Sequence, residues 1–304
     1  RLRGPLSSRV NTNTRVQRNR MIDPQLQAEV LNQALPYIQS FRGQTFVVKY
    51  GGSAMRDPSL MRGVIRNVLL LQLVGIRPIL VHGGGPEIDR WLEKLGIEKK
   101  TLQGLRVTDD QTMEVVEMAL AGRANKALAS EIGQAGGRAV GLSGRDANLL
   151  QAEAISPDLG RVGKVTHVDP SILKSTVESG TIPVVCTVAN DSEGRPLNIN
   201  ADSAAASIAI AVDASKLILL TDTDGVLGDK DRPETRISTL DCPEAKAMIQ
   251  DGRADRGMIP KLEAAIQALE HGVDKVHLIN GGAANALLIE VFTDAGIGTM
   301  MQLR

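Results

Sequence analysis

The stretch Ile79-Leu80-Val81-His82-Gly83-Gly84-Gly85-Pro86-Glu87 carries the first indication of the fold. A short apolar run that ends in glycines, without polar alternation, is typical of a strand buried on both faces. The stretch Phe46-Val47-Val48-Lys49-Tyr50-Gly51-Gly52 has the same form. Such strands occur in parallel sheets that carry helices on both sides, so the two stretches predict an α/β fold.

The alternation of apolar runs and helical patterns continues along the chain. The runs are Phe46–Tyr50, Pro78–Val81, Ala139–Leu142, Pro183–Val188, Leu217–Thr221 and Val276–Ile279. We expect a three-layer αβα sandwich with a central, mostly parallel sheet whose strands are all buried on both faces. Residues 149–168 alternate and contain Gly and Pro, which predicts an inserted β-hairpin.

An amphipathic helix is expected ahead of this body. Behind Asp23-Pro24, apolar residues recur at helical spacing at Leu26, Val30, Leu31, Leu35 and Ile38.

We divide the chain into a basic tail (1–22), this oligomerisation helix (23–42), a first lobe (43–194) and a second lobe (195–304). The lobe boundary is set near Asn190–Leu197, where turn-forming residues interrupt the strands.

Composition excludes several classes of partner. Lysine plus arginine equals aspartate plus glutamate, 35 each, and aromatic residues are 2% of the chain. Neither a charge bias nor a stacking surface therefore indicates a nucleic acid, and no charge bias or apolar run of about eighteen residues indicates a membrane. Cys186 and Cys242 have no metal-site or CxxC spacing and are expected as reduced thiols.

Residues 1–20 are rich in Arg, Ser, Thr and Asn and contain no acidic residue. This composition resembles the remnant of an organelle transit peptide, and a disordered basic tail or an expression artefact explains it equally well. Both interpretations stay open.

The glycine loops indicate a phosphate site. Ligands of parallel sheets bind beyond the carboxyl ends of the strands, and glycines let backbone N–H groups approach an anion. A single Gly-Gly is more often a tight turn, but three consecutive glycines weaken that interpretation. Neither loop fits GxGxxG, which disfavours a dinucleotide-binding oxidoreductase, and no GxxxxGK[ST] occurs.

Two lysines need anions. Lys49 ends an apolar strand, where its ammonium requires a phosphate or a structural carboxylate. Lys261 follows Pro260 in the first turn of a predicted helix, where the helix dipole disfavours a cation unless a phosphate is near or the side chain is solvated. Asp202 precedes the predicted helix Ser203–Ala211. It either caps that helix or lies between the two lysines and keeps both charged.

Two further segments have open interpretations. Residues 222–227, after the strand Leu217–Thr221, form either an adenine and ribose pocket or only a turn. Arg106, before a helix predicted near Asp109, is suited to bidentate carboxylate binding, and a surface ion pair is the alternative.

Five motifs in sequence order resemble those of the N-acetylglutamate kinases, a group within the amino-acid kinase family. They are KYGG (49–52), HGGGPE (82–87), GLRVT (104–108), NINAD (198–202) and GMIPK (257–261), and the resemblance extends from about Leu31 to Met301. It implies that Lys49 and Lys261 neutralise the phosphoryl group in transit and that Asp202 organises both. It also implies that the backbone N–H groups of Gly52 and Gly84 face that phosphoryl group.

Binding residues follow from the same resemblance. Acetylglutamate would be bound by Gly84, Gly85, Arg106 and Asn198, with Arg106 on its α-carboxylate. The nucleotide would lie against Asp222, Thr223, Asp224, Gly225, Val226, Leu227, Gly257 and Met258.

The reaction that the resemblance implies is the second step of arginine biosynthesis. The side-chain carboxylate of N-acetyl-L-glutamate attacks the γ-phosphorus of ATP and becomes an acyl phosphate. A carboxylate is ionised at neutral pH, so no general base is needed. No protein metal ligand is evident, and Mg²⁺ would be held mainly by phosphates and water.

The front helix and the C-terminal segment resemble the arginine-inhibited branch, which is hexameric, a trimer of dimers. Effector arginine would be bound by Tyr37, Lys216, His271, Gly272 and Glu290, although His271-Gly272 also fits a plain helix end.

The segment around Arg232-Pro233 resembles a loop that contacts the PII signalling protein in cyanobacterial and plant-lineage members, which suggests a plastid enzyme. Arg256 and Asn280-Gly281-Gly282 depart from the usual pattern and put details of the nucleotide and effector sites in question. The alternatives are an amino-acid kinase acting on aspartate, glutamate or carbamate, and a non-catalytic arginine sensor.

Overall fold

The computed structural model describes residues 23–55, 57–102, 104–229, 232–255 and 257–304. The basic tail (1–22), Asp231 and Arg256 therefore lie outside the described residues. Among the described residues, those up to Pro36 and those from Tyr37 onward form two separate units. Helix α1, Pro24–Phe41, confirms the predicted N-terminal helix, and its apolar residues Leu26, Val30 and Leu31 are exposed.

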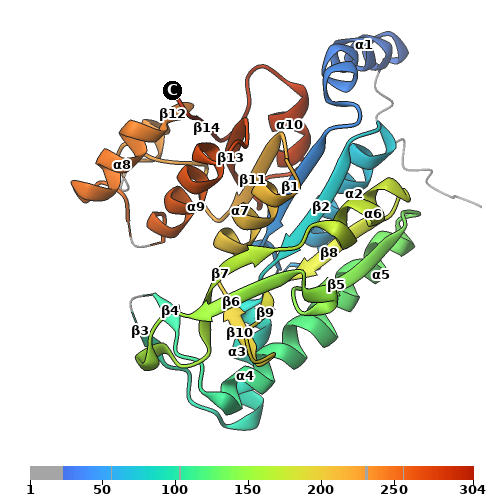
Figure 1. Cartoon of the computed structure of the whole chain (residues 1–304). Coiled ribbons are helices and arrows are strands. Elements are labelled where there is room, and N and C mark those ends of the chain that lie inside the picture. Colours follow the sequence, from blue (N-terminus) through green and yellow to red (C-terminus); the bar gives the residue numbers. More distant parts are fainter. Residues whose placement is uncertain (1–22, 56, 103, 230–231, 256) are drawn as a thin grey trace, which may run out of the picture. The chain divides into compact units, whose positions relative to one another are not determined.

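The second unit is built on an eight-stranded sheet in the order β12-β14-β13-β11-β1-β2-β8-β5 (Figure 1). Only β14 runs antiparallel to its neighbour β13, so the sheet is mostly parallel, as predicted. Its strands are β1 Thr45–Tyr50, β2 Arg77–His82, β5 Ala139–Ser143, β8 Ile182–Cys186, β11 Lys216–Thr221, β12 Thr239–Asp241, β13 Lys275–Asn280 and β14 Thr299–Gln302.

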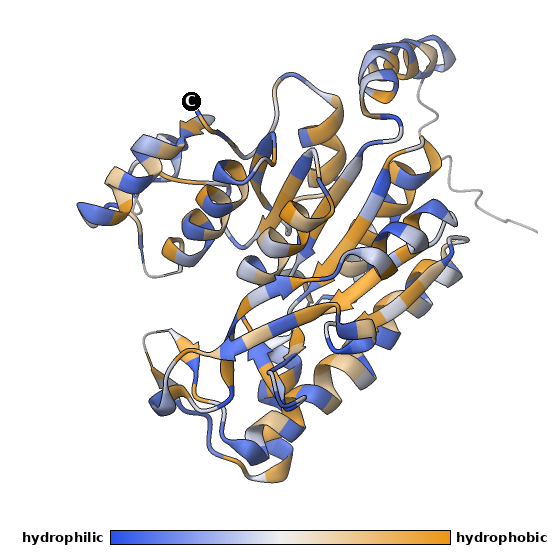
Figure 2. Ribbon diagram, in the orientation of Figure 1, coloured by the Kyte–Doolittle hydropathy of each residue, from blue (hydrophilic) through white to orange (hydrophobic). Residues whose placement is uncertain are grey.

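Helices cover both faces of this sheet. One face packs against α6 Ser171–Glu178, α7 Ala201–Ala211, α8 Cys242–Gln250 and α9 Ile259–Glu270. The other packs against α2 Pro58–Leu73, α5 Asn125–Gln134 and α10 Ala286–Phe292. Two cores result, one on each side, which confirms the three-layer architecture. Figure 2 shows the apolar colour that follows from this along β2 and β8.

A smaller group of elements lies at the carboxyl ends of the strands. It contains α3 Gly85–Leu95, the hairpin β3 Thr101–Leu102 and β4 Leu105–Arg106, α4 Asp110–Glu117, and a π-helical turn, Met118–Ala124, that joins α4 to α5. Strands β6 Leu150–Ala154, β7 Val162–Val168, β9 Val188–Asn190 and β10 Pro196–Ile199 close into a small barrel. The antiparallel pair β6–β7 confirms the predicted hairpin insertion.

One expectation about burial is wrong. Strand β5 is not buried on both faces, since Val140 is 37% exposed. The strand lies at the edge of the sheet and pairs with β8. Helix α5 packs against β5, whereas α6 packs over β2 and β8. The helix layer that contains α6 therefore leaves β5 only partly covered.

Candidate active site

Strand alternation decides the direction of Lys49. On β1, Val47 belongs to the core under α7, whereas Phe46 and Val48 belong to the opposite core. Because successive side chains of a strand point to opposite faces, Lys49 shares the side of Val47. Helix α7 begins on that side and supplies Asp202.

Asp202 pairs with both predicted lysines. Its Oδ1 lies 2.8 Å from Lys49 Nζ, and its Oδ2 accepts a hydrogen bond of 3.1 Å from Lys261 Nζ. Asp202 and Lys49 are 4% and 7% exposed. Burial alone would raise the pKa of Asp202, but the two ammonium groups outweigh it and hold that pKa below its ordinary value. Two cations share one anion, so these three side chains together carry a net positive charge.

Asp202 is not the cap of α7, which corrects one of the two interpretations. The cap is Asn200, whose Oδ1 accepts hydrogen bonds from the N–H groups of Asp202 (2.9 Å) and Ser203 (3.1 Å). Because the asparagine meets the needs of the helix end, the Asp202 carboxylate is left for the lysines. Pro260 lies in the first turn of α9, as predicted, and so presents Lys261 at the start of that helix.

The two glycine loops meet in one pocket of about 340 Å³. Strands β1 and β2 are parallel neighbours with Tyr50 opposite His82, so the loops that follow them start side by side. A Cβ on Gly51 would lie 2.9 Å from Lys49 Nζ, so the glycine allows the ammonium to reach this edge. The predicted residues that line the pocket are Lys49, Gly52, Gly84, Gly85, Arg106, Asn198 and Asp202.

Arg106 enters the pocket with one nitrogen unpaired. Its Nη2 donates to Asp89 and, at 3.4 Å, to the Gly85 carbonyl. Its Nη1 is buried and has no hydrogen-bond partner among the described residues, which suits an incoming carboxylate. Asn198 donates to Thr108 Oγ1 at 3.3 Å. The sequence interpretation missed Asp89, although it lies one helical turn after Gly85.

The predicted nucleotide segment follows β11, next to the first glycine loop. A Cβ on Gly52 would lie 2.4 Å from Asp222 Oδ1. The segment is fixed by contacts of its own: Thr223 N–H donates to Thr221 Oγ1 (3.0 Å), Asn280 donates to Asp224 (2.8 Å), and Val226 N–H donates to Thr299 Oγ1 (2.8 Å).

The remaining nucleotide residues lie in the turn before α9. The N–H groups of Gly257 and Met258 both donate to Asp255 Oδ1 at 2.7 Å. These residues and the segment 222–227 are not among those lining the 340 Å³ pocket.

A second buried polar cluster lies at the opposite end of the strands. Lys216 Nζ donates to His277 Nε2 (3.2 Å), and His277 Nδ1 donates to Glu290 Oε1 (2.7 Å). Burial lowers the pKa of Lys216 to about 8, and its ammonium lies 5.0 Å from the Phe41 ring centroid. His277 was missed because a lone histidine inside an apolar strand gives no distinctive pattern.

The other predicted effector residues are not joined to this cluster by any hydrogen bond recorded within the described ranges. Tyr37 donates to Asp294. His271 ends α9 and its Nδ1 donates to Gln267 O (2.8 Å), while Gly272 has φ 100°. This is the plain helix end that was the alternative interpretation for His271-Gly272.

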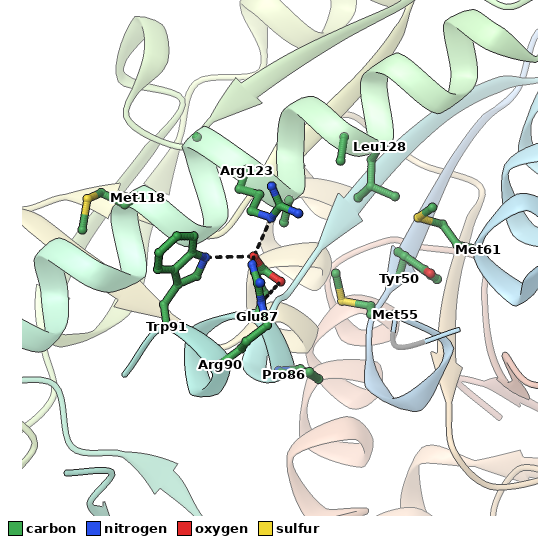
Figure 3. A pocket seen from close by; sticks show the side chains of 13 residues that line it. Tyr50, Met55, Met61, Pro86, Glu87, Arg90, Trp91, Met118, Arg123 and Leu128 are labelled. Atoms are coloured by element: carbon green, nitrogen blue, oxygen red, sulfur yellow. Dashed lines mark hydrogen bonds and ion pairs between the residues drawn. The ribbon is translucent and has the colours of Figure 1, made fainter. Parts of the chain in front are cut away.

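A larger cavity, of about 900 Å³, is not the candidate site (Figure 3). Its charged groups bind each other at the rim: Glu87 accepts from Trp91 Nε1 and Arg123 Nε, each at 2.9 Å, and from Arg90, and both arginines are more than a third exposed. Met55, Met61 and Met118 make the rest of its wall apolar. The smaller pocket is the candidate because both glycine loops, the buried Lys49–Asp202 pair and the unpaired nitrogen of Arg106 lie at it.

Within the described ranges, no helix is long and apolar enough to cross a membrane, and no group of three or more His, Cys, Asp or Glu side chains is placed to hold a metal ion. Cys186 and Cys242 are both free and buried.

Comparison with known proteins agrees with this geometry. Residues 44–280 match the model of the amino acid kinase family. Acetylglutamate kinase of Gloeobacter violaceus is 50% identical over 286 residues, covering 92% of this chain and 94% of that protein. The enzyme of the same name from Acaryochloris marina is 53% identical over 274 residues, covering 90% and 96%.

Solved structures show the same fold. N-acetylglutamate synthase from Neisseria gonorrhoeae, complexed with coenzyme A and N-acetyl-glutamate, superposes with a TM-score of 0.80 at 29% identity, over 90% of this chain and 63% of that one. Carbamate kinase from Giardia lamblia bound to AMP-PNP has a TM-score of 0.64 at 15% identity over 86% and 99%, which speaks to the fold alone. On the match over residues 44–280 and the identity of about half to curated relatives, this chain belongs to the amino acid kinase family and, within it, to the acetylglutamate kinases.

Proposed function

We propose that this chain transfers the γ-phosphoryl group of ATP to the side-chain carboxylate of N-acetyl-L-glutamate and releases an acyl phosphate. One observation carries the proposal: two ammonium groups share a single buried carboxylate, and that carboxylate and Lys49 line a pocket between two glycine loops. Such a site favours a group that gains negative charge as it moves. Curated relatives of about 50% identity are acetylglutamate kinases.

Lys49 and Lys261 neutralise the transferring phosphoryl group from two sides, and Asp202 positions both. The N–H groups of Gly52 and Gly84 complete the cradle. Since the attacking carboxylate is already ionised, no proton has to be removed, and catalysis consists of alignment and charge stabilisation.

Substrate selection rests on Gly85, Arg106 and Asn198. The buried, unpaired Nη1 of Arg106 offers a donor to the α-carboxylate of acetylglutamate, while Asp89 holds the other arm of the guanidinium. Asn198, on strand β10 of the small barrel, is a second hydrogen-bond donor at the same pocket.

ATP lies, in this proposal, over Asp222, Thr223, Asp224, Gly225, Val226 and Leu227, with Gly257 and Met258 on the other side. Mg²⁺ would be held mainly by the phosphates and water, and would supply neutralisation of the phosphate charge. We also propose that residues 43–194 and 195–304 act as the substrate and nucleotide lobes.

Arginine is proposed as a feedback inhibitor bound by Tyr37, Lys216, His271, Gly272 and Glu290. We further propose a hexameric assembly, contact of the Arg232-Pro233 loop with a PII-type protein, and a plastid location. The cyanobacterial origin of several relatives is consistent with the last two.

A coupled assay of ADP release tests the reaction. We expect turnover with acetylglutamate, much less with glutamate, aspartate or carbamate, and inhibition by added arginine. Equal turnover with glutamate would reject the substrate. Arginine binding without turnover on any of these substrates would favour the sensor instead.

A further inference from the structure

A buried pair of side chains, His82 and Asn125, lies behind the triglycine loop and has no part in the proposed reaction. Both residues are 0% exposed. His82 is the last residue of β2 and directly precedes Gly83. Asn125 is the first residue of α5, immediately after the π-helical turn.

Two carbonyl groups fix the orientation of the Asn125 amide. Its Nδ2 lies 2.8 Å from Val184 O and 3.1 Å from Leu142 O, and these atoms can only accept. The same Nδ2 lies 3.1 Å from His82 Nε2. The amide has two N–H groups for these three acceptors, so one N–H is shared between two of them. Because an amide nitrogen cannot accept, His82 Nε2 has to be the acceptor in this contact, and the ring proton must be on Nδ1.

The proton on Nδ1 then acts on the glycine loop. His82 Nδ1 lies 2.8 Å from Gly83 O and donates to it. Because the peptide bond is planar and trans, holding the Gly83 carbonyl also sets the direction of the Gly84 N–H, which points the opposite way within the same plane. The hydrogen bonds of the described residues include none from this N–H. Burial lowers the pKa of His82 to about 4, so the ring is neutral near pH 7.

The π-helical turn Met118–Ala124 positions two side chains near the triglycine loop, Leu120 and Asn125. Its closing hydrogen bond runs from Asn125 N–H to Leu120 O. In an α-helix, residues five apart would point roughly 140° away from each other, whereas an i to i+5 bond brings them onto one side. Leu120 therefore reaches the loop, and Asn125 reaches His82 directly behind it. A Cβ on Gly84 would lie 2.2 Å from Leu120 Cδ2.

We infer that His82 and Asn125 are positioning residues, which aim the Gly84 N–H at the transferring phosphoryl group by holding the Gly83 carbonyl. The π-helical turn is the element that brings Asn125 and Leu120 to the loop together. The inference rests on the proposed function, since it gives the Gly84 N–H its target.

Two substitutions distinguish the hydrogen bond that His82 donates to Gly83 O from the space that its side chain fills. His82→Leu keeps the volume but loses the donor to Gly83 O, whereas His82→Asn carries an amide N–H₂ near the position of Nδ1. We expect His82→Leu to lower kcat about 100-fold with KM values little changed, because misdirection of a donor mainly affects the transition state. His82→Asn should recover at least about tenfold of that loss. Equal loss in both variants, or no loss in either, overturns the inference.

A spectroscopic measurement on the unmodified chain does not depend on turnover. In the NMR spectrum of the chain with ¹⁵N-labelled histidine, only four imidazoles contribute signals. The signal that is lost in His82→Asn is assigned to His82. The matched control is His167→Gln, a substitution at an exposed position. We expect protonated Nδ1 and bare Nε2, unchanged from about pH 5.5 to 8. A proton on Nε2, or an imidazolium at neutral pH, overturns the network.

The titratable groups near the His82 ring are Lys126 from α5 and two residues that pair with His82 in the sheet register, Tyr50 on β1 and Cys186 on β8.

Absence of turnover in the unmodified chain would reject the proposed function. The tautomer would still test the network.

Discussion

Lys49 and Lys216 are buried lysines on adjacent parallel strands, yet their surroundings differ. Lys49 is the last residue but one of β1 and faces a carboxylate that it shares with Lys261. Lys216 begins β11 on the opposite face of the sheet, and a neutral imidazole stands between it and Glu290. The first cluster has two cations for one anion, whereas the second has one of each.

The difference in charge balance indicates which of the two clusters needs a further anion. A balanced, enclosed cluster can be purely structural, and Phe41 and Phe46 also surround the Lys216 ammonium. An excess cation beside a pocket is costly without a ligand. Burial of a lysine is thus a weaker sign of function than the charge balance around it.

The largest expected effect is on turnover. Lys261→Met should lower kcat by about 10³-fold or more, because the cation acts on charge that develops in the transition state. Steady-state assays with ATP and acetylglutamate measure this. Lys246→Met, which removes an exposed lysine paired with Glu270, is the control and should keep its rate. A fall in kcat of less than tenfold in Lys261→Met would contradict the role that distinguishes this cluster from that of Lys216.

Asp202→Asn tests the shared anion through stability. It leaves two cations without their carboxylate, so the free energy of unfolding at neutral pH should fall by roughly 3 kcal/mol, against about 1–2 kcal/mol for Glu290→Gln. Urea unfolding at fixed protein concentration measures both.

The pH dependence of that difference has a definite sign. Because the folded pKa of Asp202 is depressed, its contribution is complete above the ordinary value of about 3.9 and is lost as pH falls through the folded pKa. A difference that grows on acidification would contradict the ion pairs.

Lys216→Met tests the second cluster, in which one buried lysine is paired through His277 with Glu290. Burial lowers the pKa of Lys216 from 10.5 to about 8, so between these values the folded state binds fewer protons than the unfolded state and stability rises with pH. The unmodified chain should gain roughly 2 kcal/mol over Lys216→Met across this interval. Parallel denaturation curves at both ends test it, and a constant difference would mean that the ammonium is well solvated.

The smallest effect concerns anion binding. Tripolyphosphate at roughly five times its Kd should stabilise the unmodified chain by about 1 kcal/mol. The shift in thermal unfolding should persist in Lys216→Met and disappear in Lys261→Met. An equal loss in both variants would show that the anion responds to net charge and not to this pocket.

Much of the fold could be predicted from local pattern. The apolar runs became β1, β2, β5, β8, β11 and β13, and the insertion became a hairpin, because burial of both sheet faces leaves a signal in neighbouring residues. The full burial of β5 was the exception. A strand's position at the sheet edge depends on the order of strands, which short runs do not encode.

The site was only partly predictable. Lys49, Lys261 and the glycine loops stood out because a cation or several glycines at a strand or helix end are unusual in themselves. Asp89, His82 and Asn125 did not stand out, since each acts through a partner on another element. Asp202 had two interpretations, and the choice depended on Asn200 capping the helix.

The sequence by itself determined the alternation of strands and helices, the glycines at two strand ends and the residue types that handle phosphate, since these depend on neighbours along the chain. Only the tertiary structure decided that one carboxylate serves two lysines, that a π-helical turn supports the second glycine loop, and which buried lysine shares its carboxylate with another cation. The physical reason is that electrostatic balance and hydrogen-bond direction depend on distances between segments far apart in sequence, and the packing of both sheet faces sets those distances.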